Sequence, residues 1–444
     1  MALAFIPKET EPNETRVAGT PDSVKSLVKA GLQVRVQKGA GLAAGYPDSD
    51  YQEAHAQIVD DPVASRGEAD LIVGIGVPTT AEASQFKKGA IVVCGLQPLL
   101  HLESVKALNA AGVTVFAMDL MPRITRAQKM DVLSSQATAG GYQAVLMAAA
   151  QLPRFFPLLM TAAGTITPSK VFVLGAGVAG LQAIATARRL GAVVEANDIR
   201  PAVKEQVESL GAKFVDTGTP PQAESTGGYA KETSAEYQRK QREILTQHIS
   251  ESDVVITTAL IPGRKAPVLM TSDMIKVMRP GSVVVDMAVE MGGNVEGSRM
   301  GETVAVDGVT IIGELNLPGR VAYDASRMFA RNIIGFLELV LQDGGSLGPD
   351  WEDEVVTSTC VCRDGEVTHA ATAEALSKSP PEPAPRPEPA AQPEAAAQPE
   401  AAAAPEPPPS SESPEKDAPT PETTQSDSPP DASIEDPSTK GEAS

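Results

Sequence analysis

Short apolar runs alternate with longer amphipathic stretches along the first 320 residues of the chain. Five runs in the first third are rich in β-branched and aliphatic residues and predict strands; they are residues 3–6, 33–37, 71–75, 90–94 and 114–117. Amphipathic stretches at 22–30 and 102–111 end at Gly31 and Gly112, as helices commonly do. This rhythm is typical of a parallel sheet with helices on both faces.

A second series of runs begins after Thr165. Its six members are β-branched and continuous enough for strands buried on both faces; they are residues 171–174, 193–196, 213–215, 254–257, 283–286 and 310–312. A helical pattern at 131–151, interrupted by Gly140-Gly141, joins the two series, and another follows at 325–341. We expect the later helix to return to the first domain.

These patterns predict an α/β fold of two doubly wound, Rossmann-like domains around an interdomain cleft. Residues 1–130 with 320–370 form the first, discontinuous domain. Residues 131–319 form the second domain, which we expect to bind a dinucleotide.

The composition changes near residue 371. The chain has 37 basic and 57 acidic residues, a formal net charge of -20, which argues against a nucleic-acid binder because phosphates need a basic surface. The last 74 residues hold 18 of the 37 prolines, no aromatic residue, and only Leu376 and Ile434 as large aliphatic residues. Such a segment cannot bury enough apolar surface to offset the entropy of ordering it. Residues 371–444 are therefore predicted to be a disordered, acidic, Pro/Ala-rich tail.

The sequence shows no signal peptide, membrane span or metal site. Its N-terminus lacks a basic region followed by an apolar one, and the most apolar window, 144–163, is interrupted by polar residues and prolines. Cys360 and Cys362 are too close for a usual disulfide and make a poor zinc site, so we interpret them as two strand residues. We expect a soluble, cytoplasmic chain without a bound metal.

The most specific motif is Gly175-Ala-Gly177-Val-Ala-Gly180, which follows a predicted strand and opens a predicted helix at 181–190. Gly175 permits a tight turn, Gly177 lets the backbone approach a pyrophosphate, and Gly180 lets helix and strand pack closely. The pyrophosphate would lie at the positive end of the helix dipole. Because Asp198 ends the next strand, 18 residues after Gly180, the whole context predicts dinucleotide binding.

Asp198 also bears on the choice of cofactor. A carboxylate at this position accepts hydrogen bonds from the ribose hydroxyls and repels a 2′-phosphate. The neighbouring Arg200 offers a cation that such a phosphate would need, so the discrimination is not absolute. The pattern favours NAD(H).

Two further segments are candidates for ligand contact. Residues 121–136, Met-Pro-Arg-Ile-Thr-Arg-Ala-Gln-Lys-Met-Asp-Val-Leu-Ser-Ser-Gln, lie where the first domain ends, so their polar groups could face the cleft. The alternative, which spacing alone favours, is a charged helix start. Residues 217–234 form a long loop without apolar periodicity, with Tyr229 directly after Gly227-Gly228. This loop is either a lid that closes on a ligand or an ordinary surface loop.

Taken together, the motifs resemble those of a known family. They are Lys8-Glu-Thr, Asn13-Glu-Thr-Arg16-Val-Ala-Gly-Thr-Pro21, residues 123–131 with Ser134-Ser-Gln136, the glycine motif, Thr258-Ala-Leu260-Ile-Pro-Gly263 and Asn316-Leu-Pro-Gly-Arg320. From about residue 1 to 369 the sequence resembles the NAD(H)-binding component of the proton-translocating NAD(P) transhydrogenases, which in the divided form is the first portion of their alpha subunit. Alanine dehydrogenases share the broader superfamily pattern.

The resemblance implies roles for individual residues. Those matching Arg123, Gln128 and Asp131 form a loop that holds the nicotinamide end, and we take these three as the catalytic set. The remaining cofactor contacts that it implies run from the nicotinamide to the adenine: Ile124 in the same loop, Ser134 at the carboxamide with Tyr142 close by, Gly175, Gly177, Val178 and Gly180 at the pyrophosphate, Asp198, Ile199 and Arg200 at the adenosine ribose, Leu260 at the adenine, and Gly228 with Tyr229 in a mobile loop.

One stretch separates the two groups of relatives. Alanine dehydrogenases resemble this chain at Arg16 and His101 but carry a substrate-binding lysine in a Lys-Val-Lys-x-Pro stretch, where this sequence has Gly74-Ile-Gly76-Val-Pro78. Their catalytic aspartate position is Glu290 here. A 2-oxo acid site without the lysine loses a charge-assisted hydrogen bond. A basic residue is common there in transhydrogenases too, so the stretch departs from both patterns.

The resemblance implies an enzyme component that binds NAD(H) and passes hydride to NADP+ on a partner subunit, coupled to proton translocation, as in the Si-/Re-specific transhydrogenases. It implies a homodimer that associates with the membrane-domain portion of the alpha subunit, a separate chain, and with an NADP-binding beta subunit. Through these partners the chain would lie on the cytoplasmic face of the inner membrane. Two alternatives stay open here: a stand-alone alanine-type NAD dehydrogenase and a non-catalytic NAD-binding regulatory module.

Overall fold

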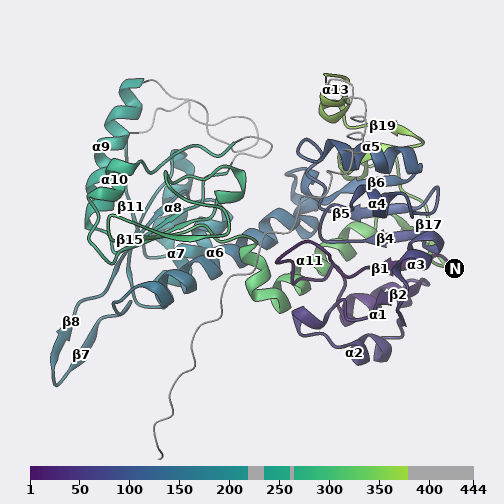
Figure 1. Ribbon diagram of the computed structural model, residues 1–444, viewed down its shortest axis with the longest axis horizontal. Helices are drawn as coiled ribbons and strands as arrows, with labels where there is room; N and C mark the ends of the chain where they lie inside the picture. The colour runs from purple at the N-terminus through teal and green to yellow at the C-terminus, as the bar shows by residue number, and fades with distance from the viewer. Residues whose placement is uncertain (219–234, 261–264, 379–444) are drawn as a thin grey trace, which may run out of the picture. The chain divides into compact units, whose positions relative to one another are not determined.

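The computed structural model describes residues 1–218, 235–260 and 265–378, and within them two large sheets, each packed with helices, dominate the fold (Figure 1). The strand order is β19-β18-β6-β5-β4-β1-β2-β3 in one sheet and β11-β10-β9-β12-β13-β15-β14 in the other. In each sheet the chain builds outward from the first strand on one side and then crosses to its other side, which is the doubly wound arrangement. The predicted fold class is confirmed.

The first sheet is built from the N-terminal strands and closed by two strands from the end of the fold. Its parallel strands are β1 (Leu3–Ile6), β2 (Gln33–Gln37), β3 (Gln57–Val59), β4 (Leu71–Val73), β5 (Ile91–Cys94) and β6 (Thr114–Ala117), and β18 (Cys360–Arg363) and β19 (Glu366–Val367) add antiparallel. Its helices are α1 (Pro21–Lys29), α2 (Asp48–Glu53), α3 (Pro62–Glu68), α4 (Thr80–Ala83), α5 (Leu102–Ala111) and α12 (Glu354–Thr359). Cys360 and Cys362 are strand residues, as predicted.

The second sheet contains β9 (Lys170–Leu174), β10 (Val193–Asn197), β11 (Lys213–Phe214), β12 (Val254–Thr257), β13 (Val283–Asp286), β14 (Thr303–Val306) and β15 (Val309–Ile312). Its helices are α7 (Val178–Arg189), α8 (Lys204–Ser209), α9 (Ala235–Glu251) and α10 (Ser272–Lys276). The hydrophobic pattern misses β14, an antiparallel edge strand, because its residues alternate between exposed and half-buried. A hairpin of β7 (Leu159–Thr161) and β8 (Gly164–Ile166) projects from this region of the chain (Figure 1).

Two long helices, α6 (Val132–Gln151) and α11 (Ala322–Leu337), pack against the large sheets. Helix α6 begins with Val132 in the core of the first sheet and continues to Ala144 and Ala148 in the core of the second. The predicted interruption at Gly140-Gly141 is wrong, since the helix runs through both glycines. Helix α11 places Phe329 and Phe336 in the core of the first sheet. The division of the chain into domains at residues 130 and 319 stays a prediction.

The boundary predicted for the tail needs a correction. Residues 371–378 belong to helix α13 (Ala370–Lys378) rather than to a disordered segment. Thr372 is buried and bonded to Nδ1 of His369, and Leu376 packs against a core cluster of the first sheet, where α13 contacts α5 and β19. The average composition of residues 371–444 therefore does not reveal this short helix, which has a buried threonine and a leucine in contact with the core. The rest of the predicted tail lies outside the described residues.

Candidate dinucleotide site

The glycine turn, residues 175–180, joins the carboxyl end of β9 to α7. Gly175 has a φ of +101°, which L-residues rarely adopt, and its carbonyl accepts a 3.0 Å hydrogen bond from Thr258 Oγ1. A Cβ built on Gly180 would lie 1.9 Å from the Gly175 carbonyl oxygen, so only glycine allows helix and strand to approach this closely.

Gly177 leaves open space above the turn. The nearest atom to a Cβ built on it would be Nη2 of Arg200, at 4.0 Å. Gly177 is also the N-cap of α7 and has no side chain to occupy the N–H groups of the first helical turn. Open backbone at a helix N-terminus is what a pyrophosphate requires, so the turn fits a dinucleotide.

Asp198 lies against this turn. Its Oδ2 accepts a 2.8 Å hydrogen bond from the Ala176 amide, and Arg200 pairs with both carboxylate oxygens, Nε with Oδ1 at 2.9 Å and Nη2 with Oδ2 at 2.8 Å. Burial alone would raise the pKa of Asp198, whose exposure is 8%, but the Arg200 guanidinium and the two backbone N–H groups outweigh it and hold the pKa below its usual value. The carboxylate is therefore charged, and Arg200 is already engaged by it.

The loop after β12, which carries Leu260, is held by two buried residues that the sequence interpretation missed. Asn294 accepts from the Ala259 amide at 3.0 Å and donates to the Ala259 carbonyl at 2.9 Å and the Pro267 carbonyl at 2.7 Å. Asp286, fully buried at the end of β13, accepts in turn from the backbone amides of Ala288, Asn294 and Val295. The sequence does contain a signal for this pair: Asp286 ends a buried apolar run, and Gly-Gly-Asn294 follows it.

The predicted nicotinamide segment is a 3-10 turn, Thr125–Met130, that leads into α6. Asp131 caps this helix: its Oδ1 accepts from the Ser134 amide at 2.9 Å and its Oδ2 from the Ser134 hydroxyl at 2.6 Å. Arg123 and Gln128 are exposed, and Ile124 packs against the core of the first sheet. The structure thus brings Asp131 and Ser134 together, in an arrangement that also serves the helix start.

Helix α6, which carries residues predicted to bind the nicotinamide, packs beside α7, whose first turn is predicted to bind the pyrophosphate (Figure 1). Tyr142 is exposed on α6 beside the point where that helix crosses the first turn of α7, and Val178 is the exposed first residue of α7. Ile199 is half-buried between Asp198 and Arg200. Gly228 and Tyr229 lie outside the described residues. The contacts of all these residues with a cofactor stay predictions.

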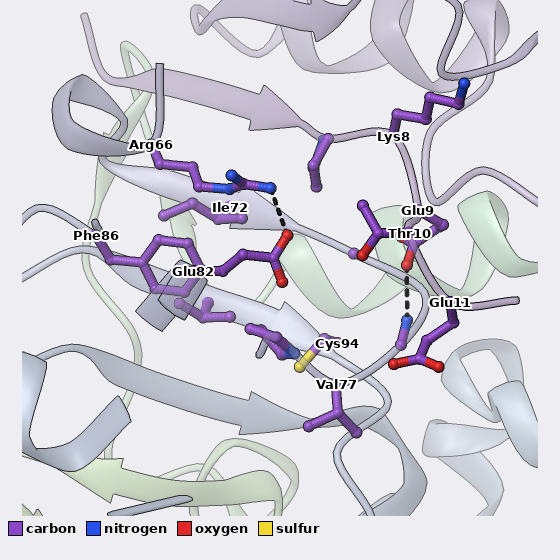
Figure 2. Close-up of a pocket in the computed structure, with 15 residues that line it drawn as sticks. Lys8, Glu9, Thr10, Glu11, Arg66, Ile72, Val77, Glu82, Phe86 and Cys94 are labelled. Atoms are coloured by element: carbon purple, nitrogen blue, oxygen red, sulfur yellow. Dashed lines mark hydrogen bonds and ion pairs between the residues drawn. The ribbon is translucent and has the colours of Figure 1, made fainter. Parts of the chain in front are cut away.

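A separate small cavity lies at the carboxyl edge of the first sheet, between the loops that follow β1 and β4. It has a volume of about 30 Å³, room for about one water molecule, and Glu9, Gly76, Cys94 and the Arg66–Glu82 ion pair are among its lining residues (Figure 2). Glu9 accepts hydrogen bonds from the amides of Ile75, at 2.7 Å, and Gly76, at 3.3 Å. Burial, which outweighs these two bonds, raises the pKa of Glu9 to about 7.

The fold and the glycine turn define the class: a doubly wound α/β protein with a dinucleotide-type turn in its second sheet. Residues 5–139 match the family model described as "Alanine dehydrogenase/PNT, N-terminal domain", and residues 144–370 match "Alanine dehydrogenase/PNT, C-terminal domain". The chain belongs to the alanine dehydrogenase/PNT family.

Individual relatives agree with this assignment. The chain is 49% identical over 374 residues to the first portion of the divided NAD(P) transhydrogenase subunit alpha of Rhodospirillum rubrum, covering 82% of this chain and 97% of that protein. A crystal structure of transhydrogenase from Sinorhizobium meliloti has a TM-score of 0.73 and 47% identity, covering 83% of this chain and 99% of that one. An alanine dehydrogenase of Halomonas elongata is 30% identical over 379 residues, 84% of this chain and 96% of that protein.

Proposed function

We propose that this chain is the NAD(H)-binding component of a proton-translocating NAD(P) transhydrogenase, which passes hydride between NADH and NADP+ held by a partner subunit. The observation that carries the proposal is the turn itself: open backbone at Gly177, an uncapped helix start, and a charged Asp198 bonded to the Ala176 amide. The similarity to transhydrogenase alpha subunits selects the reaction among those that such a turn serves.

When bound, the nicotinamide supplies the hydride, and the protein positions it. The first-turn amides of α7 would bind the pyrophosphate, and Asp198 would accept hydrogen bonds from the adenosine ribose. Arg123, Gln128 and Asp131 would hold the nicotinamide end, with Ser134 at its carboxamide. The location of the cofactor between the two sheets rests on the resemblance to the family.

An alanine-type dehydrogenase is the second candidate, because relatives with that name match nearly the whole fold. Two sets of contacts and one missing cation argue against it. Arg16 pairs with Glu14, at 2.6 Å, and donates to Gln136; Glu290 accepts the Asn316 amide at 2.8 Å; and no cation follows β4 to offset Glu9, since positions 74 and 76 are glycines. The groups that an anionic 2-oxo acid would need are engaged elsewhere or missing.

The partners follow from the same proposal. The relatives' designation as one portion of subunit alpha implies other subunits, and we assign these as the separate membrane-domain portion of alpha and an NADP-binding beta subunit. No helix among the described residues is long and apolar enough to cross a membrane. On the resemblance to the family, we propose that these partners hold the chain at the cytoplasmic face of the inner membrane.

The proposed homodimer has a candidate contact in the β7–β8 hairpin. Met160 is 81% exposed near its tip, and Phe155 and Leu158 are exposed at its base. An exposed apolar hairpin of this kind favours association with another chain. Met160→Asp with Leu158→Ser should shift the chain toward monomer in sedimentation analysis, and an unchanged sedimentation coefficient would contradict this contact.

Direct hydride transfer is the decisive test. The chain is mixed with the NADP-binding beta subunit, NADP+ and NADH carrying deuterium at the nicotinamide C4 position. We expect deuterium in the NADPH formed, as measured by mass spectrometry, and none when either protein is omitted. Oxidation of alanine by the chain alone would establish the dehydrogenase instead, and NADH binding without any transfer would favour the regulatory module.

The catalytic set has its own test. Arg123→Ala, Gln128→Asn and Asp131→Asn should bind NADH within a modest factor of wild type but transfer hydride on the order of 100-fold more slowly, because a misplacement of about 1 Å costs that much. Asparagine at 131 is also a good N-cap, so this variant keeps the start of α6. Full transfer rates in all three variants would place the reacting ring elsewhere.

A further inference from the structure

Helices α6 and α7 touch backbone to backbone at one point. A Cβ built on Gly141 would lie 2.2 Å from the carbonyl oxygen of Ala179 and 2.9 Å from its carbonyl carbon. Contacts below 3.0 Å to backbone cannot be relieved by rotating a side chain, so any larger residue at 141 must displace one of the two helices.

The same contact continues into the glycine turn. Ala179 precedes Gly180, whose own missing Cβ admits the Gly175 carbonyl, and the Thr258 hydroxyl donates a hydrogen bond to that carbonyl. Three backbone segments are therefore stacked without intervening side chains: α6 at Gly141, the first turn of α7, and the end of β9. Because backbone meets backbone at each of these contacts, the stack fixes the position of α6 relative to the glycine turn.

Helix α6 carries the residues assigned to the nicotinamide end. Asp131 caps it, Ser134 lies in its first turn, and Tyr142 follows Gly141 directly. The turn on α7 carries the residues assigned to the pyrophosphate. The distance between these two groups thus depends on how closely α6 and α7 approach at Gly141.

The preceding glycine offers a contrast within the same helix. The three atoms nearest to a Cβ built on Gly140 all belong to side chains: the terminal Cε of Met287, at 3.2 Å, and atoms of Leu317 and Pro318 at 3.8 Å. A methionine end moves aside easily. Both glycines are buried and helical, so alanine brings the same gain in helix propensity at either position and differs only in what it meets.

We propose that Gly141 is a positioning residue for hydride transfer, which sets the spacing between the nicotinamide end held by α6 and the pyrophosphate held by α7. This rests on the proposed function, because it takes the two ends of one dinucleotide to lie on these two helices. The glycine acts through the helices and does not itself touch the cofactor.

The test compares Gly141→Ala with Gly140→Ala in the full chain, using NADH and ADP-ribose, which lacks the nicotinamide. We expect Gly141→Ala to bind ADP-ribose within about threefold of wild type, bind NADH at least tenfold more weakly, and transfer hydride to the partner on the order of 100-fold more slowly. Gly140→Ala should match wild type with both ligands.

Two results would overturn the proposal: unchanged NADH binding and transfer in Gly141→Ala, or an equal loss of both ligands in a folded variant, which would confine the role of Gly141 to the turn.

Hydrogen exchange on the wild-type chain is a second test, which needs no variant. ADP-ribose should protect the amides of residues 139–143 together with those of 177–181, and protection confined to 177–181 would contradict the stack. Failure of wild type to bind either ligand would count against the proposed function instead.

Discussion

Each of the two sheets has a carboxylate at its carboxyl edge, Glu9 after β1 and Asp198 after β10, and the pKa values of these two groups are shifted in opposite directions. β1 in the first sheet and β9 in the second are each flanked by parallel strands on both sides, β2 and β4 or β10 and β12. At the carboxyl edge beside each of them an acid accepts backbone amides: Glu9 from Ile75 and Gly76, and Asp198 from Ala176. The pKa of Glu9 is raised to about 7, whereas that of Asp198 is lowered.

The difference comes from the cations. Burial raises the pKa in both cases, and in Asp198 a two-point contact with Arg200 adds charge and hydrogen bonds that reverse the effect. For Glu9, burial and the negative charge of Glu14 raise the pKa, and only its two amides and the charge of Arg16, which already pairs with Glu14, lower it. Two backbone amides alone do not offset burial of a carboxylate, whereas a bidentate guanidinium in addition does.

The loops differ as well. After β9 the chain enters α7 within three residues, so the helix N-terminus lies directly over the sheet edge. After β1 the chain runs from Pro7 to Thr20 before α1 begins. Of these two strands, only β9 is followed directly by a helix whose dipole and open N-terminal amides could meet an anionic ligand.

The largest expected effect comes from placing one methyl group at the carboxyl edge of each sheet and comparing NADH binding. Gly177→Ala should weaken NADH binding on the order of 100-fold, about 2.7 kcal/mol, because the methyl group fills the space that a pyrophosphate would occupy. Gly76→Ala, whose Cβ would make an ordinary 3.6 Å contact with Glu9, should leave NADH binding unchanged. Fluorescence titration with NADH measures both. Equal losses would show that the first edge also takes part in nucleotide binding.

The next effect tests the cation that distinguishes the two acids. Asp198→Ala should weaken NADH binding by about 1.5–3 kcal/mol for each charged hydrogen bond lost and raise the affinity for a 2′-phosphorylated cofactor relative to it, because Arg200 loses its carboxylate partner. The double variant Asp198→Ala, Arg200→Ala should lose that relative gain. Unchanged NADH affinity in a folded Asp198→Ala variant would remove Asp198 from the ribose site.

The sequence predicts those features that depend on neighbours along the chain. The strands at 3–6, 114–117 and 254–257 are predicted to the residue because each is a mostly buried apolar run, and the strand at 33–37 because buried valines alternate with polar residues. Asp198 is found from its spacing to the glycine turn. Glu9 is missed because its environment is made by a loop 66 residues away. The two glycines of α6 are misread as a break because the atoms that Gly141 accommodates, those of the Ala179 carbonyl, belong to another helix.

A smaller effect concerns stability and pH at the first edge. The raised pKa means that, between about pH 4.5 and 7, folded Glu9 holds a proton that the unfolded chain has released, so stability falls as pH rises through this window. Glu9→Gln cannot lose that proton. Relative to wild type, the variant should therefore gain on the order of 1–3 kcal/mol between pH 5 and pH 8, as measured by thermal melts at both values. Parallel pH profiles for variant and wild type would show that Glu9 titrates normally.

The smallest expected effect comes from deleting the C-terminal residues, which should change neither sheet edge. Removal of residues 379–444 should leave the melting temperature and NADH binding unchanged, because their composition provides no apolar surface to pack. Removal from residue 371 onward takes away most of α13 as well, with buried Thr372 and with Leu376, which packs against a core cluster of the first sheet. That longer deletion should cost about 1–2 kcal/mol of stability at the first sheet and still spare NADH binding, since the glycine turn belongs to the second sheet. A lower melting temperature in the shorter deletion would mean that residues beyond Lys378 contribute to the fold, and loss of NADH binding in either would link the tail to the site.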